Sequence, residues 1–367
     1  MNAYIAWTPL HIINIINTMM NFFPNEKNDI YIYDEFENAE ILYQNLKKEN
    51  IFSNVYYVSS ENMGNILNKG FCLLTNRQNH IKHESIYDNI FIQGGNYFSK
   101  LLYAENKKKN SNLKLYYIED GLGAYVGSPI IRVDTLGKKM MKVINRYSMY
   151  NSEILNYFVY EPGLVKYEGR NDFFRLPKLL SDNPAYSSIK KIFGVDEELA
   201  NTISRGILYF DQPFLDDGFS INEIESFNCL KKIVGDEDLL VKFHPRSKKN
   251  KYGADIKELK TTLPWELLCL TTEISDLTLI SIATTASFTP FLMLNRNIPV
   301  ILLAEIYLEI AYREEWNEKT ISMLKNVVDF TKEFVAETGA TFYLPKTMNE
   351  AKALLVSKVE SEEELCQ

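Results

Sequence analysis

Short apolar segments alternate with longer amphipathic segments over roughly the first third of the chain. The amphipathic segments carry apolar residues at helical spacing, as at Ile12, Ile13 and Ile16, whereas the short runs have the composition of buried strands. The predicted strands cover residues 3–9, 29–34, 54–60, 89–95 and a run from residue 113, and the predicted helices cover residues 10–23, 39–50 and 97–109. Such alternation predicts a mostly parallel sheet, and therefore one Rossmann-like domain.

The alternation stops at about residue 160 and restarts after residue 200. The stretch 161–188 holds three prolines and two glycines, which is typical of a connection between domains. Further strands are predicted over residues 205–213, 238–246, 277–282 and 298–303, with helices over residues 221–234 and 285–295. We therefore expect an N-terminal Rossmann-like domain (1–160), a linker (161–200) and a C-terminal Rossmann-like domain (201–367). This α/β organisation suggests the GT-B architecture, with ligands in a cleft at the carboxyl ends of both sets of strands.

Composition and charge exclude several classes of protein. Apolar residues make up 46% of the chain and aromatic residues 13%, which is enough for sizeable cores. The 40 Lys and Arg residues are outnumbered by 48 Asp and Glu residues, giving a net charge of −8. A protein that binds nucleic acid through the phosphate backbone needs a positive charge, so no nucleic-acid partner is expected.

The cysteines and the N-terminus indicate a reducing, cytoplasmic setting. The four cysteines (Cys72, Cys229, Cys269 and Cys366) are far apart, so neither a zinc site nor a disulfide framework can be inferred from them. The first residues lack the basic start and cleavage site of a signal peptide, and no window of about 18 uninterrupted apolar residues occurs.

A basic segment ends the second predicted strand of the C-terminal domain. Pro245 has no N–H to donate and terminates the strand, which places His244 and Arg246 at the sheet edge. A His and an Arg there can face a phosphate, because the imidazole donates to a leaving oxygen and the guanidinium offers a planar set of donors. An ordinary solvated turn is the alternative.

Small hydroxyl residues fill the turn before the predicted helix over residues 285–295. The side chains of Ser281, Thr284, Thr285 and Ser287, with the backbone N–H groups of a helix start, predict an anion site that suits a nucleotide phosphate. Simple capping of the helix by Thr285 or Ser287 is the alternative.

Two acidic turns complete the set of candidate residues. Glu119, Asp120 and Gly121 follow the strand that begins at residue 113, and Asp216 and Asp217 lie in the loop after the first strand of the C-terminal domain. A carboxylate there could take a proton from an acceptor hydroxyl, and the glycine lets the backbone turn beside a sugar. Either turn could also be an ordinary Asp-Gly loop.

In this order the motifs resemble those of bacterial sialyltransferases of glycosyltransferase family 52, which include lipooligosaccharide α-2,3-sialyltransferases and capsule sialyltransferases. Those enzymes carry an acidic D/E-D/E-G motif, an HP motif and a Ser/Thr-rich motif. Here the corresponding residues are Glu119-Asp120-Gly121, His244-Pro245 and the run from Ser281 to Ser287, and the start at Trp7-Thr8-Pro9-Leu10 is also similar. The family usually places its catalytic carboxylate shortly before the HP motif, where this chain offers Asp211, Asp216 and Asp217 without a one-to-one match.

The resemblance implies an inverting, metal-independent sialyltransferase that moves sialic acid from CMP-Neu5Ac to a terminal galactose of a capsule or lipooligosaccharide-type glycan. No metal ligands or cofactor are expected, because the monophosphate leaving group needs little electrophilic help. The base is Asp216 or Asp217, with Asp120 as the alternative, and His244 assists the leaving group. Donor contacts are expected from His244, Pro245, Arg246, Ser281, Thr284, Thr285 and Ser287, and acceptor contacts from Thr8, Pro9, Gly95, Asn96, Glu119 and Gly121.

Other functions and partners stay open at this stage. The same fold could use CMP-Kdo or a UDP-sugar as donor, or the chain could be a non-catalytic subunit of capsule assembly. The Met-rich segment with Lys138, Lys139, Lys142 and Arg146 suggests peripheral contact with the inner face of the cell membrane, against the alternative of a solvated helix. A homodimer also stays open.

Overall fold

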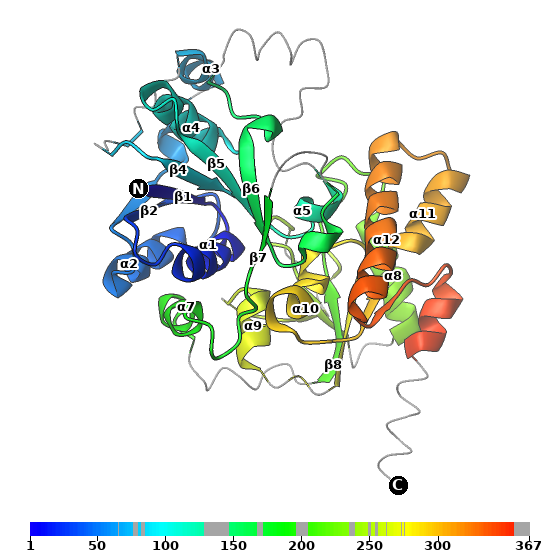
Figure 1. Ribbon diagram of the computed structural model, residues 1–367. Coiled ribbons are helices and arrows are strands. Elements are labelled where there is room, and N and C mark those ends of the chain that lie inside the picture. Colours follow the sequence, from blue (N-terminus) through cyan, green and yellow to red (C-terminus); the bar gives the residue numbers. More distant parts are fainter. Residues whose placement is uncertain are drawn as a thin grey trace. The chain divides into compact units, whose positions relative to one another are not determined.

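The chain forms two compact units in the computed structural model, and each is described separately here (Figure 1). Unit 1 comprises Met1–Asp196 and unit 2 comprises Glu197–Gln367. The residues that the structure describes are 1–64, 66–75, 80–81, 85–127, 147–166, 172–195, 205–234, 239–248, 251–253, 256–261, 263–272, 274 and 276–355. The basic residues of the segment with Lys138 to Arg146, for which the sequence left membrane contact and a solvated helix as alternatives, lie outside these ranges.

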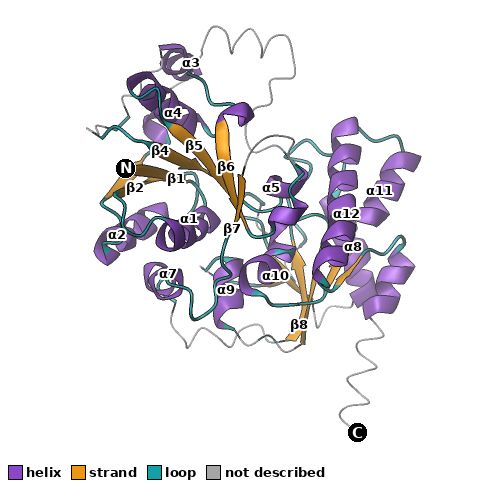
Figure 2. Cartoon of the chain, viewed as in Figure 1, coloured by secondary structure: helices purple, strands orange, loops and turns teal. Residues whose placement is uncertain are grey.

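Unit 1 contains a seven-stranded, fully parallel sheet in the order β3-β2-β1-β4-β5-β6-β7 (Figures 1 and 2). The strands are β1 (Asn2–Ala6), β2 (Asn28–Tyr33), β3 (Asn54–Val58), β4 (Asn89–Ile92), β5 (Lys114–Ile118), β6 (Ile154–Val159) and β7 (Asp172–Arg175). The helices are α1 (Pro9–Phe22), α2 (Ala39–Glu49), α3 (Ile66–Thr75), α4 (Tyr97–Lys109), α5 (Gly123–Val126) and α7 (Ala185–Phe193), with 3₁₀ turns at Glu61–Met63, Asn151–Glu153 and Pro162–Leu164.

The central strands of this sheet are buried on both faces. All residues of β1 and β2 are buried, which explains why these segments show continuous apolar runs and no strict alternation. From β1 the chain moves outward through α1 to β2, whereas from β4 it moves the other way through α4 to β5. Because such crossovers are right-handed, the reversal puts α1 and α4 on opposite faces, as Figure 1 shows. The sheet therefore has a topological switch point between β1 and β4.

The expected linker over residues 161–200 differs from the structure. Its described part contributes β7 to the sheet of unit 1 and contributes α7, which packs on α1 and α2. The α7 helix buries Ala185, Ile189 and Ile192, which lie on one helical face, and the Ile192 carbonyl accepts a hydrogen bond of 2.7 Å from Asn45. The prolines that suggested a linker do not prevent this packing, because Pro184 lies just before the first residue of α7.

Unit 2 contains a six-stranded parallel sheet in the order β10-β9-β8-β11-β12-β13. Its strands are β8 (Arg205–Phe210), β9 (Leu239–Lys242), β10 (Lys257–Glu258), β11 (Asp276–Ser281), β12 (Val300–Leu302) and β13 (Phe342–Tyr343). Its helices are α8 (Glu223–Val234), α9 (Trp265–Thr271), α10 (Thr289–Leu294), α11 (Ala304–Arg313) and α12 (Glu318–Thr338), with a 3₁₀ turn at Thr285–Ser287. Here the strand order reverses between β8 and β11, which gives a second switch point.

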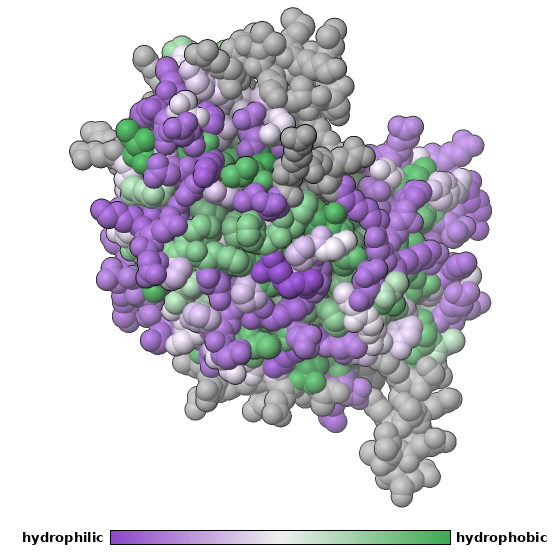
Figure 3. Space-filling model, viewed as in Figure 1, coloured by the Kyte–Doolittle hydropathy of each residue, from purple (hydrophilic) through white to green (hydrophobic). Residues whose placement is uncertain are grey.

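Aromatic packing fixes the long helix α12 on the rest of unit 2. Phe330 and Phe334 of α12 contact Phe288, which follows the 3₁₀ turn after β11, with ring centroids 5.4 and 5.5 Å apart from it. The outer surface over α11 and α12 is mainly hydrophilic (Figure 3). Over the residues that the structure describes, no helix combines the length and apolar character that crossing a membrane would need.

Candidate functional site

In unit 2, three neighbouring strands bring the predicted donor residues to one edge of the sheet. Strands β9, β8 and β11 are adjacent and parallel, so the loops after them share this edge. Asp211, the first residue after β8, is buried and accepts hydrogen bonds from the backbone N–H of His244 (3.2 Å) and from the Tyr252 hydroxyl. Its carboxylate also forms a 2.6 Å ion pair with Lys251. Asp211 therefore holds the loop after β9 in place, and its carboxylate is already bonded to His244, Tyr252 and Lys251.

The half-buried imidazole of His244 has a defined tautomer. Its Nδ1 accepts a hydrogen bond of 3.2 Å from the backbone N–H of Arg246, so the ring proton is on Nε2 in the neutral form. Burial, followed by the nearby Arg246 charge, lowers the pKa of His244 below its ordinary value. In the described part of the chain Nε2 has no hydrogen-bond partner. The structure thus presents a neutral Nε2–H donor at the edge where a phosphate is expected.

Arg246 and Asp217 form a two-pronged ion pair at the same edge. The guanidinium nitrogens lie 2.6 and 2.9 Å from the two carboxylate oxygens, and Lys319 donates to the Asp217 backbone carbonyl. The hydrogen bonds from Arg246 lower the pKa of the Asp217 carboxyl. A carboxylate that is bonded at both oxygens and has a depressed pKa is a poor proton acceptor, which weighs against Asp217 as the base. Asp216 next to it is exposed.

The hydroxyl turn after β11 is only partly available to a ligand. Ser281 and Ser287 are buried, and their Oγ atoms are hydrogen-bonded to each other at 2.8 Å. Thr284 and Thr285 are half-buried, and the Thr284 hydroxyl accepts from the Ala286 N–H at 3.4 Å. The expected helix start at residue 285 is a 3₁₀ turn, and α10 begins only at Thr289. Donor contacts by these residues stay a prediction, and the geometry favours Thr284 and Thr285 for them.

In unit 1, the acidic turn follows β5, which neighbours β4 in the sheet. The Glu119 carboxyl is buried, where Oε2 accepts hydrogen bonds from the Tyr125 hydroxyl (2.5 Å) and the Tyr160 N–H (2.8 Å). Burial raises the pKa of Glu119 to about 8, and those hydrogen bonds oppose the shift. The Glu119 carbonyl accepts from Asn14 of α1 at 2.8 Å, which ties the turn to α1. This arrangement gives Glu119 a structural role, and its contact with an acceptor stays a prediction.

Asp120 is the half-buried carboxylate of this turn. Its Oδ1 accepts a 2.5 Å hydrogen bond from the Tyr117 hydroxyl, and burial nevertheless raises the pKa of Asp120 to about 6. Gly121 has φ of 107°, a conformation that favours glycine. A Cβ atom at Gly123 would lie 3.0 Å from Asp120 Oδ1, so the glycine leaves room for the carboxylate. An accessible carboxylate with a pKa near neutral pH suits general-base chemistry.

The other predicted acceptor residues lie at the β1/β4 switch point. Thr8 and Asn96 cap α1 and α4, with their side-chain oxygens 3.2 Å from the His11 N–H and 2.7 Å from the Ser99 N–H. Pro9 is the first residue of α1, and Gly95 is half-buried in the turn after β4. These residues shape the edge where strand-end ligands bind in open α/β sheets. Their contact with an acceptor stays a prediction.

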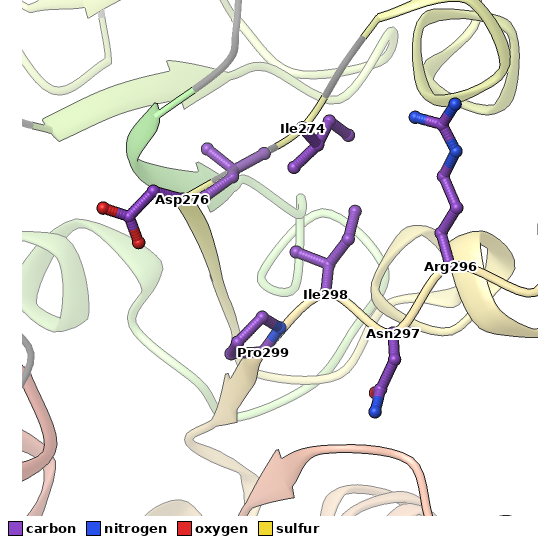
Figure 4. A pocket seen from close by; sticks show the side chains of 7 residues that line it. Ile274, Asp276, Arg296, Asn297, Ile298 and Pro299 are labelled. Atoms are coloured by element: carbon purple, nitrogen blue, oxygen red, sulfur yellow. The ribbon is translucent and has the colours of Figure 1, made fainter.

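A separate pocket of about 520 Å³ lies at the amino ends of β11 and β12 (Figure 4). Asp276 and Arg296 stand on opposite sides of it with their charged groups turned away from each other, and Arg296 donates to the Thr272 carbonyl. The predicted donor residues lie at the carboxyl ends of the strands, so this pocket is not part of the candidate site. Among the described residues, no group of three or more His, Cys, Asp or Glu side chains is arranged to hold a metal ion.

Sequence reasoning gave no role to one polar residue at the switch point of unit 1, Gln93, which it included in the strand over residues 89–95. The Gln93 amide donates to the His11 carbonyl at 3.2 Å and joins the loops after β4 and β1. A polar residue between an apolar strand and two glycines was the signal that could have pointed to Gln93.

Comparisons with known proteins define the fold. No family model and no curated protein matches the chain. The UDP-GlcNAc 2-epimerase of Methanocaldococcus jannaschii in complex with UDP-GlcNAc and UDP is similar at a TM-score of 0.52 and 15% identity, covering 98% of this chain and 91% of that one. For the UDP-GlcNAc 2-epimerase of Neisseria meningitidis the TM-score is 0.47 at 12% identity, covering 98% of this chain and 100% of that one. For a spinosyn rhamnosyltransferase complexed with thymidine diphosphate the TM-score is 0.42 at 8% identity, covering 98% of this chain and 96% of that one.

The protein therefore has the two-domain α/β fold of the GT-B type, and the predicted fold class is confirmed in this respect. Both domains are Rossmann-like, with parallel sheets and a switch point at the strand ends. At 15% identity the likeness shows the fold alone, so function has to be argued from the site.

Proposed function

We propose that the protein is an inverting, metal-independent sialyltransferase that transfers sialic acid from CMP-Neu5Ac to a terminal galactose of a capsule or lipooligosaccharide-type glycan. The proposal rests on one observation: strand-end loops present a neutral imidazole that can donate a hydrogen bond, His244, and a carboxylate that can accept a proton, Asp120. The same three motifs give the chain its resemblance to family 52. The low cysteine content supports a cytoplasmic location.

The donor would bind at the β8/β9/β11 edge of unit 2. His244 Nε2–H would donate to a phosphate oxygen as the glycosidic bond breaks, and Thr284 and Thr285 would offer hydroxyl groups to the nucleotide. Arg246 carries a charge that can be shared between Asp217 and a phosphate, because its fork of donors suits either anion. Asp217 then keeps Arg246 at the edge until the donor arrives.

The acceptor hydroxyl would be deprotonated by Asp120. We place the base here and not at Asp216 or Asp217 because Asp120 is only half-buried and burial raises its pKa to about 6. The Asp217 carboxyl is bonded to Arg246 at both oxygens. The activated hydroxyl would attack the anomeric carbon from the face opposite CMP, through an oxocarbenium-like transition state, and so invert the configuration.

The donor assignment is tested by thermal unfolding with CMP, UMP, UDP, GDP and UDP-GlcNAc. We expect CMP to stabilise the protein most, because at equal concentrations the nucleotide with the lowest Kd raises the free energy of unfolding most. At 100 times Kd the increase is about 2.7 kcal/mol. Transfer from CMP-Neu5Ac to lactose, followed by mass spectrometry, tests the reaction itself. A clear preference for UDP, or epimerisation of UDP-GlcNAc, would instead support the UDP-sugar alternative that the fold also permits.

Transfer is expected to continue in excess EDTA. The donor's phosphodiester carries one negative charge, and CMP gains a second as the glycosidic bond breaks. His244 and Arg246 can stabilise that charge, so the chemistry does not require a divalent cation. Initial rates with EDTA and with added Mg²⁺ or Mn²⁺ should agree. Loss of turnover in EDTA that Mg²⁺ or Mn²⁺ restores would show that a metal takes part.

A further inference from the structure

The switch point of unit 1 holds a second imidazole whose outer nitrogen is available. His11 is in the first turn of α1, directly after β1, and is only 4% exposed. Its Nδ1 accepts a hydrogen bond of 3.4 Å from the Trp7 N–H, which places the ring proton on Nε2. In the part of the chain that is described, Nε2 has no hydrogen-bond partner. It is not one of the unpartnered side-chain atoms that are fully buried.

This imidazole stays neutral over the physiological range. Burial alone lowers the pKa of His11 to about 3. A neutral Nε2–H group is a directional donor that suits an uncharged hydroxyl, whereas an imidazolium would favour an anion. The chemistry of His11 therefore fits a sugar hydroxyl better than a phosphate.

Gln93 holds this histidine in place from the loop after β4. Its side-chain amide donates to the His11 carbonyl at 3.2 Å. Gln93 is only 1% exposed and its Oε1 is sealed from solvent, so Gln93 positions His11 and does not itself face a ligand. Gly94, which follows, has φ of 125°, so the backbone turns away directly after this side chain.

Trp7 supplies the apolar part of the same edge. The half-buried indole packs edge-on against the His11 ring, with centroids 4.4 Å apart at 88°. An aromatic face beside directional hydrogen-bonding groups is the combination that recognises a pyranose, which has one apolar face and a rim of hydroxyls.

We propose that Trp7 and His11, with His11 positioned by Gln93, form the acceptor-sugar subsite of unit 1, in which His11 Nε2–H donates to a hydroxyl of the terminal galactose. The inference rests on the proposed function, because it assumes a galactose acceptor. It names a specificity residue outside the three motifs: His11 binds the sugar, and the carboxylate of Asp120 takes the proton.

Two substitutions of His11 separate binding from structure. In His11→Asn, Oδ1 can still accept from the Trp7 N–H, but the outer donor is gone. In His11→Gln, the amide nitrogen reaches the position of Nε2. We expect KM for lactose to rise about tenfold in His11→Asn, the worth of one lost hydrogen bond, and to stay near wild type in His11→Gln. Binding of CMP is followed beside KM, because the predicted donor residues belong to unit 2 and His11 belongs to unit 1. Equal KM values in the two variants, or a larger rise in His11→Gln, would overturn the inference.

A measurement on the wild-type protein does not depend on turnover. The chain has four histidines, so ¹⁵N-histidine spectra are simple, and the His11 signals are those missing from His11→Gln. We expect the Nε2–H tautomer from pH 5 to pH 8 and a lactose-dependent shift of the Nε2 signal. A His11 signal that ignores saturating lactose would overturn the subsite, whether or not transfer occurs. A shift without CMP binding would instead keep the subsite and refute the proposed donor.

Discussion

Replacing Asp120 by Asn is expected to lower kcat for transfer to lactose by about 10²- to 10⁴-fold, the usual worth of general-base catalysis. The amide keeps the shape of the carboxyl group and can still pair with the Tyr117 hydroxyl, but it cannot accept the proton of the attacking hydroxyl. Binding of CMP should stay near wild type, because Asp120 belongs to unit 1 and the predicted donor residues belong to unit 2. Steady-state transfer kinetics and CMP titration measure the two effects separately.

The pH dependence of the same reaction checks the assignment. A base must be deprotonated, so kcat/KM should fall about tenfold per pH unit below the pKa of Asp120, which burial raises to about 6. The matched controls are Asp216→Asn and Asp217→Asn. Both should keep kcat, and the second should weaken CMP binding because Arg246 loses its partner. If Asp120→Asn is active while one of the controls loses kcat, the base belongs to the loop after β8.

The two Rossmann-like domains could be predicted because their strands are buried on both faces and stand out as apolar runs. The segments that became β1, β2 and most of β4 are of this kind. The assignment of residues 161–200 to a linker differed from the structure because proline and glycine counts describe local chain geometry only. The packing of α7 on α1 and α2, and the bond from Asn45 to the Ile192 carbonyl, depend on residues more than 100 positions apart in sequence.

The positions of the candidate residues could be predicted, but their chemical states could not. A strand end followed by a polar turn fixes where His244, Asp120 and Asp217 lie in the fold. Asp217 is paired with Arg246, and Asp211 is paired with Lys251. Both pairs join neighbouring loops, and the sequence alone does not show that these loops are neighbours. The difference between Glu119 and Asp120 also depends on burial. The two carboxyl groups are adjacent in the same motif, but Glu119 is buried and Asp120 is half-buried.

Both units show the same hydrogen-bond arrangement at the carboxyl-end edge of their sheets. In each, a backbone N–H occupies Nδ1 of a histidine, from Trp7 to His11 in unit 1 and from Arg246 to His244 in unit 2. Each imidazole is thereby left with its proton on the outer nitrogen. The difference is that His244 lies beside Arg246 and suits an anionic leaving group, whereas burial alone sets the state of His11.

Removal of this donor from unit 2 is expected to affect both reactions of the donor sugar. His244→Ala should lower the rates of transfer to lactose and of slow CMP-Neu5Ac hydrolysis together, each by about 10²- to 10⁴-fold, because cleavage of the bond to CMP is common to both. Asp120→Asn should lower transfer and leave hydrolysis near wild type, because water is a smaller nucleophile that needs no positioned base for slow turnover. The ratio of transfer to hydrolysis therefore separates the roles of the two residues.

The matched control is His244→Gln, whose amide nitrogen reaches the position of Nε2 but carries no transferable proton. If His244 acts only as a hydrogen-bond donor to the departing phosphate, His244→Gln should recover a large part of the rate lost in His244→Ala. If the imidazolium form of His244 transfers a proton, the two variants should be equally slow. Hydrolysis, in which Asp120 takes no part, should then lose its dependence on pH in both. Hydrolysis that proceeds at the wild-type rate in His244→Ala would remove His244 from bond cleavage and leave Arg246 and the hydroxyl turn as the groups that stabilise CMP.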